Sequence, residues 1–174
     1  AGAIFDVTKL DFLNSQHMAN LSHEEFINAI NPFLIDVDIN LNEHIKKDLL
    51  IESMRSSSNT LKGVCNNLIC YFKDIEEYNQ RAIEKFIGNS DKVVSDLRNK
   101  INDLKTWDES SLDTLLQKYR EEHDLPIPKV NQPIRIALTG STNSPSLGTT
   151  LYLFEKEEVL NRLDALISFL HKDN

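Results

Sequence analysis

A polar segment in the last third of the chain has the residue types best suited to recognising a ligand. Residues 132–147 read QPIRIALTGSTNSPSL. The segment joins one cation, Arg135, to a turn from Gly140 to Pro145 that is rich in hydroxyl and amide side chains. An arginine, hydroxyl groups and exposed backbone groups together can read an unstacked nucleobase and hold its phosphate. A structural interpretation is also open, in which Arg135 binds carbonyl groups at a helix end and the turn only joins two helices.

The rest of the sequence has no recognisable catalytic or metal-binding set. The five glycines are dispersed, so they form no phosphate-binding loop. Five histidines lack a second ligand at helical spacing: His17, His23, His44, His123 and His171. Cys65 and Cys70 lie five positions apart in an apolar helical pattern, so we interpret them as reduced thiols. We therefore expect no cofactor and no metal ion in this chain.

Composition and charge predict a globular protein. The 174 residues are 40% hydrophobic and 26% charged, which is enough for a sizeable core and excludes a disordered chain. The net charge of −8 argues against non-specific wrapping of nucleic acid but leaves room for a local site. The sequence has no run of about 18 apolar residues and no secretory signal, so we expect a cytoplasmic protein that does not contact a membrane.

Apolar positions recur at helical spacing almost throughout, which predicts an all-α fold of about nine helices. The first is expected over residues 9–20, with Thr8 as its cap. A second should begin at a capping box formed by Ser22 and Glu25 and end near Pro32.

Two further helices are expected before the middle of the chain. Asn42 is the predicted cap of one that includes Ile45, and Thr60 is the predicted start of the next. The composition becomes charged after Asp74, where we place a boundary between two helical subdomains, 1–74 and 75–174, that touch each other.

The second subdomain should contain helices over residues 76–87 and 91–104. Asp108 is the predicted cap of the next helix, and Trp107 before it is interpreted as a packing residue.

The polar segment itself is ambiguous in secondary structure. Pro126 and Pro128 predict an extended approach to it. Residues 134–138 alternate in polarity like a strand, but a single short strand has no partner, which favours a helical or irregular segment. Ser144 followed by Pro145 predicts the start of another helix.

Several motifs in order resemble the anticodon-binding, C-terminal part of bacterial glutamyl-tRNA synthetases, and the likeness covers nearly the whole chain. They are Phe5-Asp6 with Lys9-Leu10 and Asn14, Met54-Arg55, Thr60-Leu61-Lys62, Trp107, Gln132-Pro133 with Arg135, Thr139-Gly140, Ser144-Pro145 with Leu147, and Lys156-Glu157 with Leu160 and Arg162-Leu163.

The resemblance implies an all-helical cage of two subdomains and a non-catalytic fragment of a glutamate–tRNA ligase. The ATP and Mg²⁺ used by the parent enzyme would then be bound by an upstream catalytic domain of the same polypeptide, whose motifs are not in this sequence. The implied partner is a tRNA, that for glutamate, with glutamine tRNA as a second candidate. We expect the protein to be a monomer.

The resemblance also implies which residues read the anticodon. By position they are Gln132, Arg135, Ser144, Pro145, Leu147, Gly148 and Ser57. Ser57 stands where relatives that discriminate the third anticodon base have a large basic residue, and Gly148 stands where some relatives have a bulky apolar one. An alternative function is an acidic helical module for protein–protein interaction.

Overall fold

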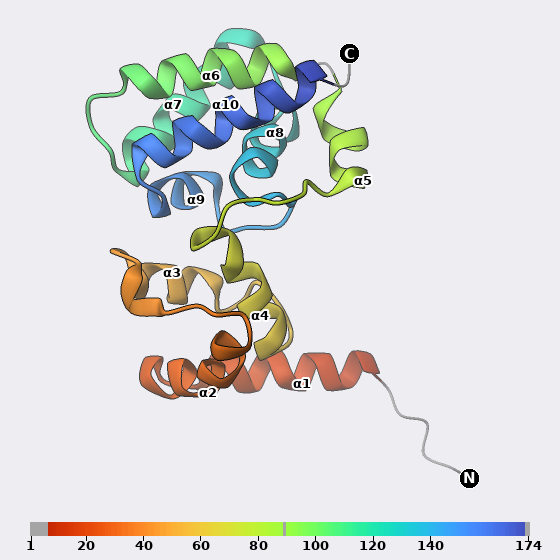
Figure 1. Cartoon of the computed structure of the whole chain (residues 1–174), viewed down its shortest axis with the longest axis vertical. Helices are drawn as coiled ribbons and strands as arrows, with labels where there is room; N and C mark the ends of the chain where they lie inside the picture. The colour runs from red at the N-terminus through yellow and green to blue at the C-terminus, as the bar shows by residue number, and fades with distance from the viewer. Residues whose placement is uncertain (1–6, 89, 173–174) are drawn as a thin grey trace. The chain divides into compact units, whose positions relative to one another are not determined.

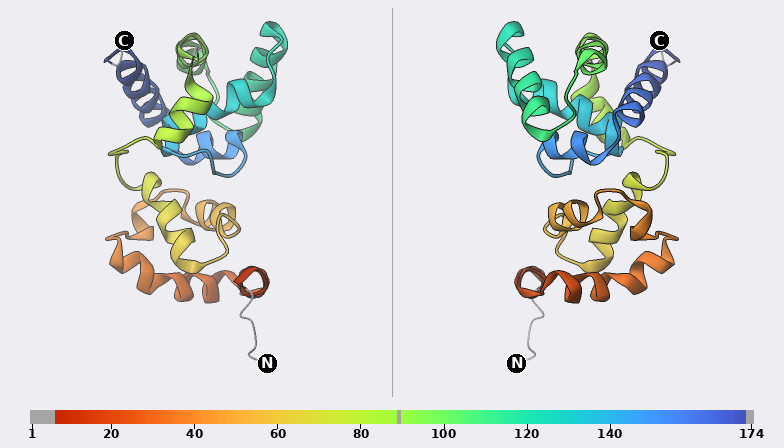
Figure 2. Two further views of the ribbon diagram at one scale, coloured as in Figure 1. Left: turned by 90° about the vertical axis from the view of Figure 1, so that its right-hand side faces the viewer. Right: turned by 90° about the vertical axis from the view of Figure 1, so that its left-hand side faces the viewer.

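The computed structural model describes residues 7–88 and 90–172, and every regular element within them is helical, which confirms the all-α prediction (Figure 1). The chain divides into two compact units, residues 1–73 and 74–174. Figure 2 shows the helices of each unit from two further sides. No helix in the described ranges has the length and apolar character needed to cross a membrane.

The first unit packs α2 against α4 around an apolar core. Its elements are α1 (Val7–Asn20), α2 (His23–Asp36), the 3₁₀ turn η1 (Leu41–Glu43), α3 (Lys47–Met54), α4 (Leu61–Leu68) and the 3₁₀ turn η2 (Ile69–Tyr71). Phe26, Ile30, Leu50, Val64 and Leu68 are fully buried there. Their spacing places one apolar face of each helix toward the others.

Both cysteines are free thiols, as expected from their spacing. Cys65 is buried in this core, and burial raises its pKa to about 11 because the thiolate would lose its hydration. Cys70 is partly exposed.

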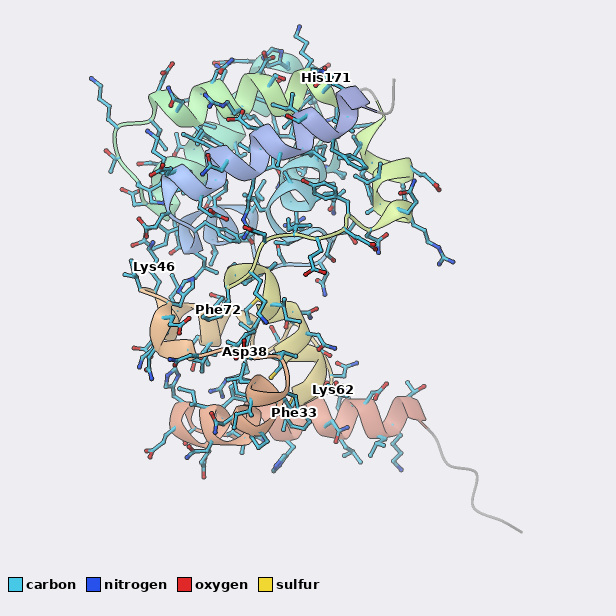
Figure 3. All side chains as sticks on the ribbon, viewed as in Figure 1. Phe33, Asp38, Lys46, Lys62, Phe72 and His171 are labelled. Carbon is cyan, nitrogen blue, oxygen red and sulfur yellow. The ribbon has the colours of Figure 1, made fainter. Side chains whose placement is uncertain are left out.

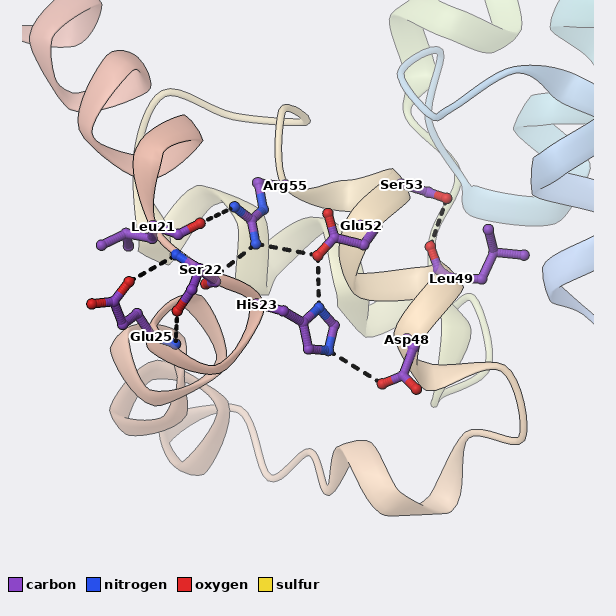
Figure 4. A network of polar contacts seen from close by, with 9 residues as sticks. All are labelled: Leu21, Ser22, His23, Glu25, Asp48, Leu49, Glu52, Ser53 and Arg55. Carbon is purple, nitrogen blue, oxygen red and sulfur yellow. Dashed lines mark hydrogen bonds and ion pairs between the residues drawn. The ribbon is translucent and has the colours of Figure 1, made fainter.

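Two of the predicted helix starts in this unit are confirmed. Ser22 Oγ accepts from Glu25 N at 3.2 Å, and Glu25 Oε2 accepts from Ser22 N at 2.8 Å, which completes the capping box (Figure 4). Thr60 Oγ1 accepts from Gly63 N at 3.0 Å at the start of α4.

An ion-pair network next to this capping box joins α2 to α3 (Figure 4). His23 Nδ1 lies 2.6 Å from Glu52 Oε1, and His23 Nε2 lies 3.2 Å from Asp48 Oδ1. Arg55 Nη2 donates to Glu52 Oε1 at 3.2 Å, and a second Arg55 nitrogen donates to Leu21 O. The hydrogen bond to Glu52 raises the pKa of His23, because the imidazolium can donate from both nitrogens.

Three predicted boundaries in the first unit are wrong. Helix α1 already includes Thr8, so that residue is not its cap. Helix α2 continues through Pro32, since proline removes only one helical hydrogen bond and Leu34 beyond it is buried. It ends before Asp38, whose position is labelled in Figure 3. Asp38 takes a left-handed conformation with φ 54°.

The third helix starts at Lys47 rather than after Asn42. Asn42 lies in η1, where its N–H donates to Asn40 Oδ1 at 3.1 Å. This local side-chain bond competes with a helical start, and Ile45 is left 84% exposed.

The second unit packs α10 against α6 and α8, and α7 against α9. Its elements are α5 (Gln80–Ala82), the π-helical turn η3 (Ile83–Ile87), α6 (Asp91–Asp103), α7 (Glu109–His123), α8 (Ile127–Thr139), α9 (Leu147–Leu153) and α10 (Lys156–Lys172). Leu97, Leu112, Ile134, Leu151 and Leu163 are fully buried between them.

Most of the expected elements before α8 are present. Helix α6 matches the prediction over 91–104 to within one residue, and Asp108 Oδ1 caps α7 by accepting from Ser111 N at 2.7 Å. The helix predicted over 76–87 is shorter, because Asn79 caps a helical segment that starts only at Gln80. Trp107 is partly buried, and its Nε1 donates to Phe154 O at 3.0 Å.

Helix α8 corrects the expectation of an extended approach to the polar segment. Pro126 is its N-cap, and Pro128 lies in the first turn, where a helix does not need the missing N–H. Residues 134–138 are helical, so the strand-like alternation was misleading. Ile134, Ile136 and Leu138 are all fully buried, because neighbours cover this helix on more than one side.

Candidate functional site

Helix α8 presents one polar stripe. Asn131, Gln132, Arg135 and Thr139 are partly exposed, while Pro133, Ile134 and residues 136–138 are buried. Because residues three or four apart share a face of a helix, these four side chains lie along one line. We call them the α8 stripe.

Arg135 is fixed to the loop that follows the helix. Its Nε donates to Ser144 Oγ at 2.7 Å, and its Nη2 donates to Pro145 O at 3.2 Å. Ser144 Oγ also lies 2.9 Å from Thr150 Oγ1. The structure thus brings together three of the predicted site residues, with the guanidinium held in one orientation.

Ser144 is not the helix cap that its position before Pro145 predicted. Helix α9 begins at Leu147, and its N-cap is Ser146, whose Oγ accepts from Thr149 N at 3.2 Å. The Ser144 hydroxyl is used instead by Arg135 and Thr150. The side-chain contacts of Ser144 with residues six and nine positions away therefore accompany a helix start that lies two residues later than predicted.

Gln132 lies one helical turn before Arg135 and carries a buried acceptor. Among the described residues its Oε1 is one of a few buried side-chain atoms without a hydrogen-bond partner. An acceptor left unpaired in the folded protein costs about 1–3 kcal/mol, so we expect a donor to pair with it.

The turn after α8 is held from several directions. Gly140 has φ 71°, a left-handed conformation that glycine adopts without strain, and its N–H donates to Ile136 O at 2.8 Å. Thr139 Oγ1 lies 2.9 Å from Arg135 O and 3.1 Å from Ser141 O. Asn79 N donates to Gly140 O at 3.1 Å. The loop of residues 140–146 therefore starts from a defined geometry.

Leu147 and Gly148, which follow the loop of residues 140–146, are buried. Leu147 is 3% exposed, so its side chain does not face a ligand. A Cβ atom at Gly148 would collide with the carboxylate of Asp113 on α7. Thr149 Oγ1 donates to Glu109 Oε1 at 2.6 Å, which places a second carboxylate of α7 at the start of α9. These carboxylates disfavour a phosphate at the start of α9. Arg135 is the one cation among the predicted site residues, so it is the residue of that set that can pair with a phosphate.

Ser57 belongs to the other unit. It lies in the turn after α3, where its Oγ and its O accept from Asn67 Nδ2 at 3.3 Å and 3.0 Å. The remaining six predicted residues are all in the second unit.

Sequence reasoning did not select Asn131, Thr139 and Thr150 as members of this site. The first two complete the α8 stripe, and Thr150 supports Ser144. Helical spacing of polar residues from Arg135 would have indicated the stripe once the segment was taken as a helix.

Comparisons with known proteins identify the family. Residues 24–167 match the family described as "Anticodon binding domain". The chain is 31% identical over 167 residues to a glutamate–tRNA ligase of Myxococcus xanthus, covering 95% of the chain and 35% of that protein. It is 26% identical over 171 residues to glutamate–tRNA ligase 2 of Coxiella burnetii, covering 98% of the chain and 36% of that protein.

A solved structure shows the same fold. The crystal structure of a glutamate tRNA ligase from Elizabethkingia meningosepticum superposes with a TM-score of 0.79 at 22% identity, over 97% of this chain and 33% of that one.

The chain therefore belongs to the anticodon-binding domain family. Within that family it corresponds to the anticodon-binding portion of glutamate–tRNA ligases, which confirms the resemblance seen in its motifs. It spans about a third of the length of the ligases it matches.

Proposed function

We propose that the α8 stripe and the loop of residues 140–146 bind the anticodon loop of a tRNA. The observation that carries this proposal is the fixed guanidinium of Arg135, one turn from the unpartnered acceptor of Gln132. Arginine pairs with a phosphate or a base edge, and the carboxamide of the partly exposed Gln132 side chain has the donor and acceptor groups that pair with a base edge. A nucleotide whose base is unstacked offers a phosphate to the arginine and a base edge to the glutamine.

The fixed geometry of Arg135 supports selective binding. Its bonds to Ser144 and Pro145 hold the side chain without a ligand, so little rotamer entropy is lost on binding. The loop backbone is likewise set in place by Gly140 and Ser146. Donors and acceptors at fixed positions can distinguish one base from another.

The parent activity that this proposal implies is the ligation of glutamate to its tRNA. ATP and Mg²⁺ would be bound by a catalytic domain that lies upstream in the same polypeptide. This chain would contribute affinity and selectivity for tRNA as a monomer in the cytoplasm.

A titration with short RNA hairpins tests the proposal. We expect the chain to bind an anticodon stem-loop with the glutamate anticodon more tightly than the same stem with a scrambled loop, at one fixed salt concentration. Affinity should fall steeply with added salt, because phosphate contacts release counterions. Equal affinity for both hairpins would contradict anticodon reading, and salt-insensitive binding of a protein partner would favour the interaction-module alternative.

The third anticodon base separates glutamate from glutamine tRNA. Ser57 lacks the paired donors of an arginine and already accepts from Asn67, so we propose that the chain itself distinguishes these two anticodons weakly. A good bidentate contact to a base gives about 1–3 kcal/mol of discrimination, and Ser57 cannot make one. Hairpins that differ only at this base should therefore bind within about tenfold of each other. A larger ratio would contradict this proposal while leaving anticodon binding intact.

A further inference from the structure

Thr150 of α9 is a polar residue without solvent exposure. Its side chain is 0% exposed, next to the core residue Leu151. A buried hydroxyl needs hydrogen-bond partners, because it loses its water on folding. Thr150 Oγ1 lies 2.9 Å from Ser146 O and 3.3 Å from Pro145 O, so the carbonyl one helical turn back is the nearer acceptor for its proton. The Thr150 oxygen can then accept a hydrogen bond itself.

Ser144 is placed to donate that hydrogen bond. Ser144 Oγ lies 2.9 Å from Thr150 Oγ1 and 3.1 Å from Pro145 O, so the shorter contact favours donation to Thr150. Ser144 Oγ in turn accepts from Arg135 Nε at 2.7 Å. Each hydroxyl thus accepts one hydrogen bond and donates one, as serine and threonine can. We call this series the Arg135 relay, and its members are Arg135, Ser144, Thr150 and the carbonyl of Ser146.

The direction of the relay decides how firmly Arg135 is held. Pro145 O accepts from Arg135 Nη2 at 3.2 Å, and the Ser144 hydroxyl is also within reach of this carbonyl. Without Thr150 as an acceptor, the Ser144 proton would turn to Pro145 O and compete with Arg135 for it. With Thr150 in place, Arg135 keeps both of its acceptors, and hydrogen bonds in series strengthen one another.

We propose that Thr150 is a positioning residue for anticodon recognition, which holds Ser144 in the orientation that fixes Arg135. The inference rests on the proposed function, because it concerns how Arg135 is held for the RNA. Thr150 is fully buried, so it acts on the RNA only through other residues. The competing interpretation is structural, in which its hydroxyl serves only α9 through the bond to Ser146 O. A structural role alone would change the stability of the fold and leave the bonds of Arg135 as they are.

The first test needs no RNA. NMR measures how fast the Nε proton of Arg135 exchanges with water in the free chain. Thr150→Val keeps the branched shape and removes the hydroxyl, so we expect exchange to become about fivefold faster or more, because the acceptor of this proton is no longer held. Thr150→Ser retains the hydroxyl and should restore the wild-type rate. Thr149→Val is the matched control, since Thr149 Oγ1 donates to Glu109 instead, and should leave the rate unchanged.

Ser144→Ala extends this test to a partly exposed position, where the substitution spares the core if Thr150→Val does not fold. We expect Ser144→Ala to accelerate the exchange of the Arg135 Nε proton at least as much. An unchanged rate in either folded variant would overturn the relay, and so would a wild-type rate as fast as that of free arginine. Equal acceleration in Thr149→Val would assign the effect to α9 as a whole and would also overturn it.

Hairpin binding connects the relay to the anticodon. Thr150→Val should raise the Kd for the glutamate hairpin by about 2-fold to 10-fold, the effect of losing one neutral hydrogen bond. In an Arg135→Ala background the same substitution should have no further effect, because no guanidinium is left to position. Losses that add would show that Thr150 acts independently of Arg135 and would overturn the positioning role. Equal binding of the glutamate and scrambled hairpins by the wild type would contradict anticodon reading, whereas the exchange rates would still test the relay.

Discussion

Replacing Arg135 by alanine is the sharpest perturbation of the proposed interface. The change removes a cation that donates to Ser144 Oγ at 2.7 Å and to Pro145 O at 3.2 Å. One charged contact to a phosphate or a base edge contributes about 1–3 kcal/mol. We therefore expect the Kd for the glutamate hairpin to rise by about 5-fold to 150-fold.

The salt dependence of binding identifies which group Arg135 contacts. If Arg135 pairs with a phosphate, the slope of log K against log salt concentration should decrease by about one in the variant. If it reads a base edge, the slope should stay unchanged and the preference over the scrambled loop should shrink. Fluorescence titrations with both hairpins at several salt concentrations measure both quantities.

Arg98→Ala is the matched control for lost charge. Arg98 is also a partly buried arginine of the second unit, but it pairs with Asp164 of α10 at 2.8 Å. Each variant loses one positive charge, so a non-specific effect would weaken both proteins equally. Thermal unfolding of each variant shows whether the fold is intact. Unchanged hairpin affinity in a folded Arg135→Ala protein would refute the assignment of Arg135 to the interface.

Three further predictions concern single side chains. Gln132→Leu should raise the melting temperature of the free chain, because it removes a buried unpaired acceptor worth about 1–3 kcal/mol, and should weaken hairpin binding; unchanged binding would exclude Gln132 from the interface. The pKa of His23 is raised in the folded protein, so its stabilising contribution is fully present below about pH 6.5 and is lost as the pH rises through the raised value. The melting temperatures of the wild type and His23→Gln should thus differ at acid pH and converge above neutral pH, and a constant difference would contradict the ion-pair network. Because Cys65 is buried with a pKa of about 11, one thiol should react with a thiol reagent in the native protein and two after unfolding, and rapid native labelling of both would contradict this packing.

The sequence predicted helix starts correctly where a cap bonds to a residue close to it in the chain. Ser22, Thr60 and Asp108 each cap a helix through a bond to a residue three positions away, so short-range sequence was sufficient. Family motifs predicted the two-part helical architecture and the position of the polar segment. Neither source specified the hydrogen bonds that hold Arg135.

The start of α9 depended on contacts that the local sequence does not show. Ser144 had the sequence context of a helix cap, but Arg135 and Thr150 use its hydroxyl, and Ser146 caps the helix instead. Leu147 stays a predicted site residue, and its side chain lies in the core. Residues 134–138 are helical, in line with the helical or irregular segment expected there, and they alternate like a strand because one partly exposed position, Arg135, interrupts a helix that is otherwise buried there.

The most direct test of the account is the residue-by-residue map of hairpin binding by NMR. Adding the glutamate anticodon stem-loop should shift the side-chain amide of Gln132, the Nε signal of Arg135 and the backbone amides of residues 140–144 and 146 more than other signals of the second unit. Arg98 Nε, which pairs with Asp164, should stay unchanged. Shifts confined to other surfaces of the unit, with Gln132 and Arg135 unaffected, would contradict the claim that this helix and loop read the anticodon.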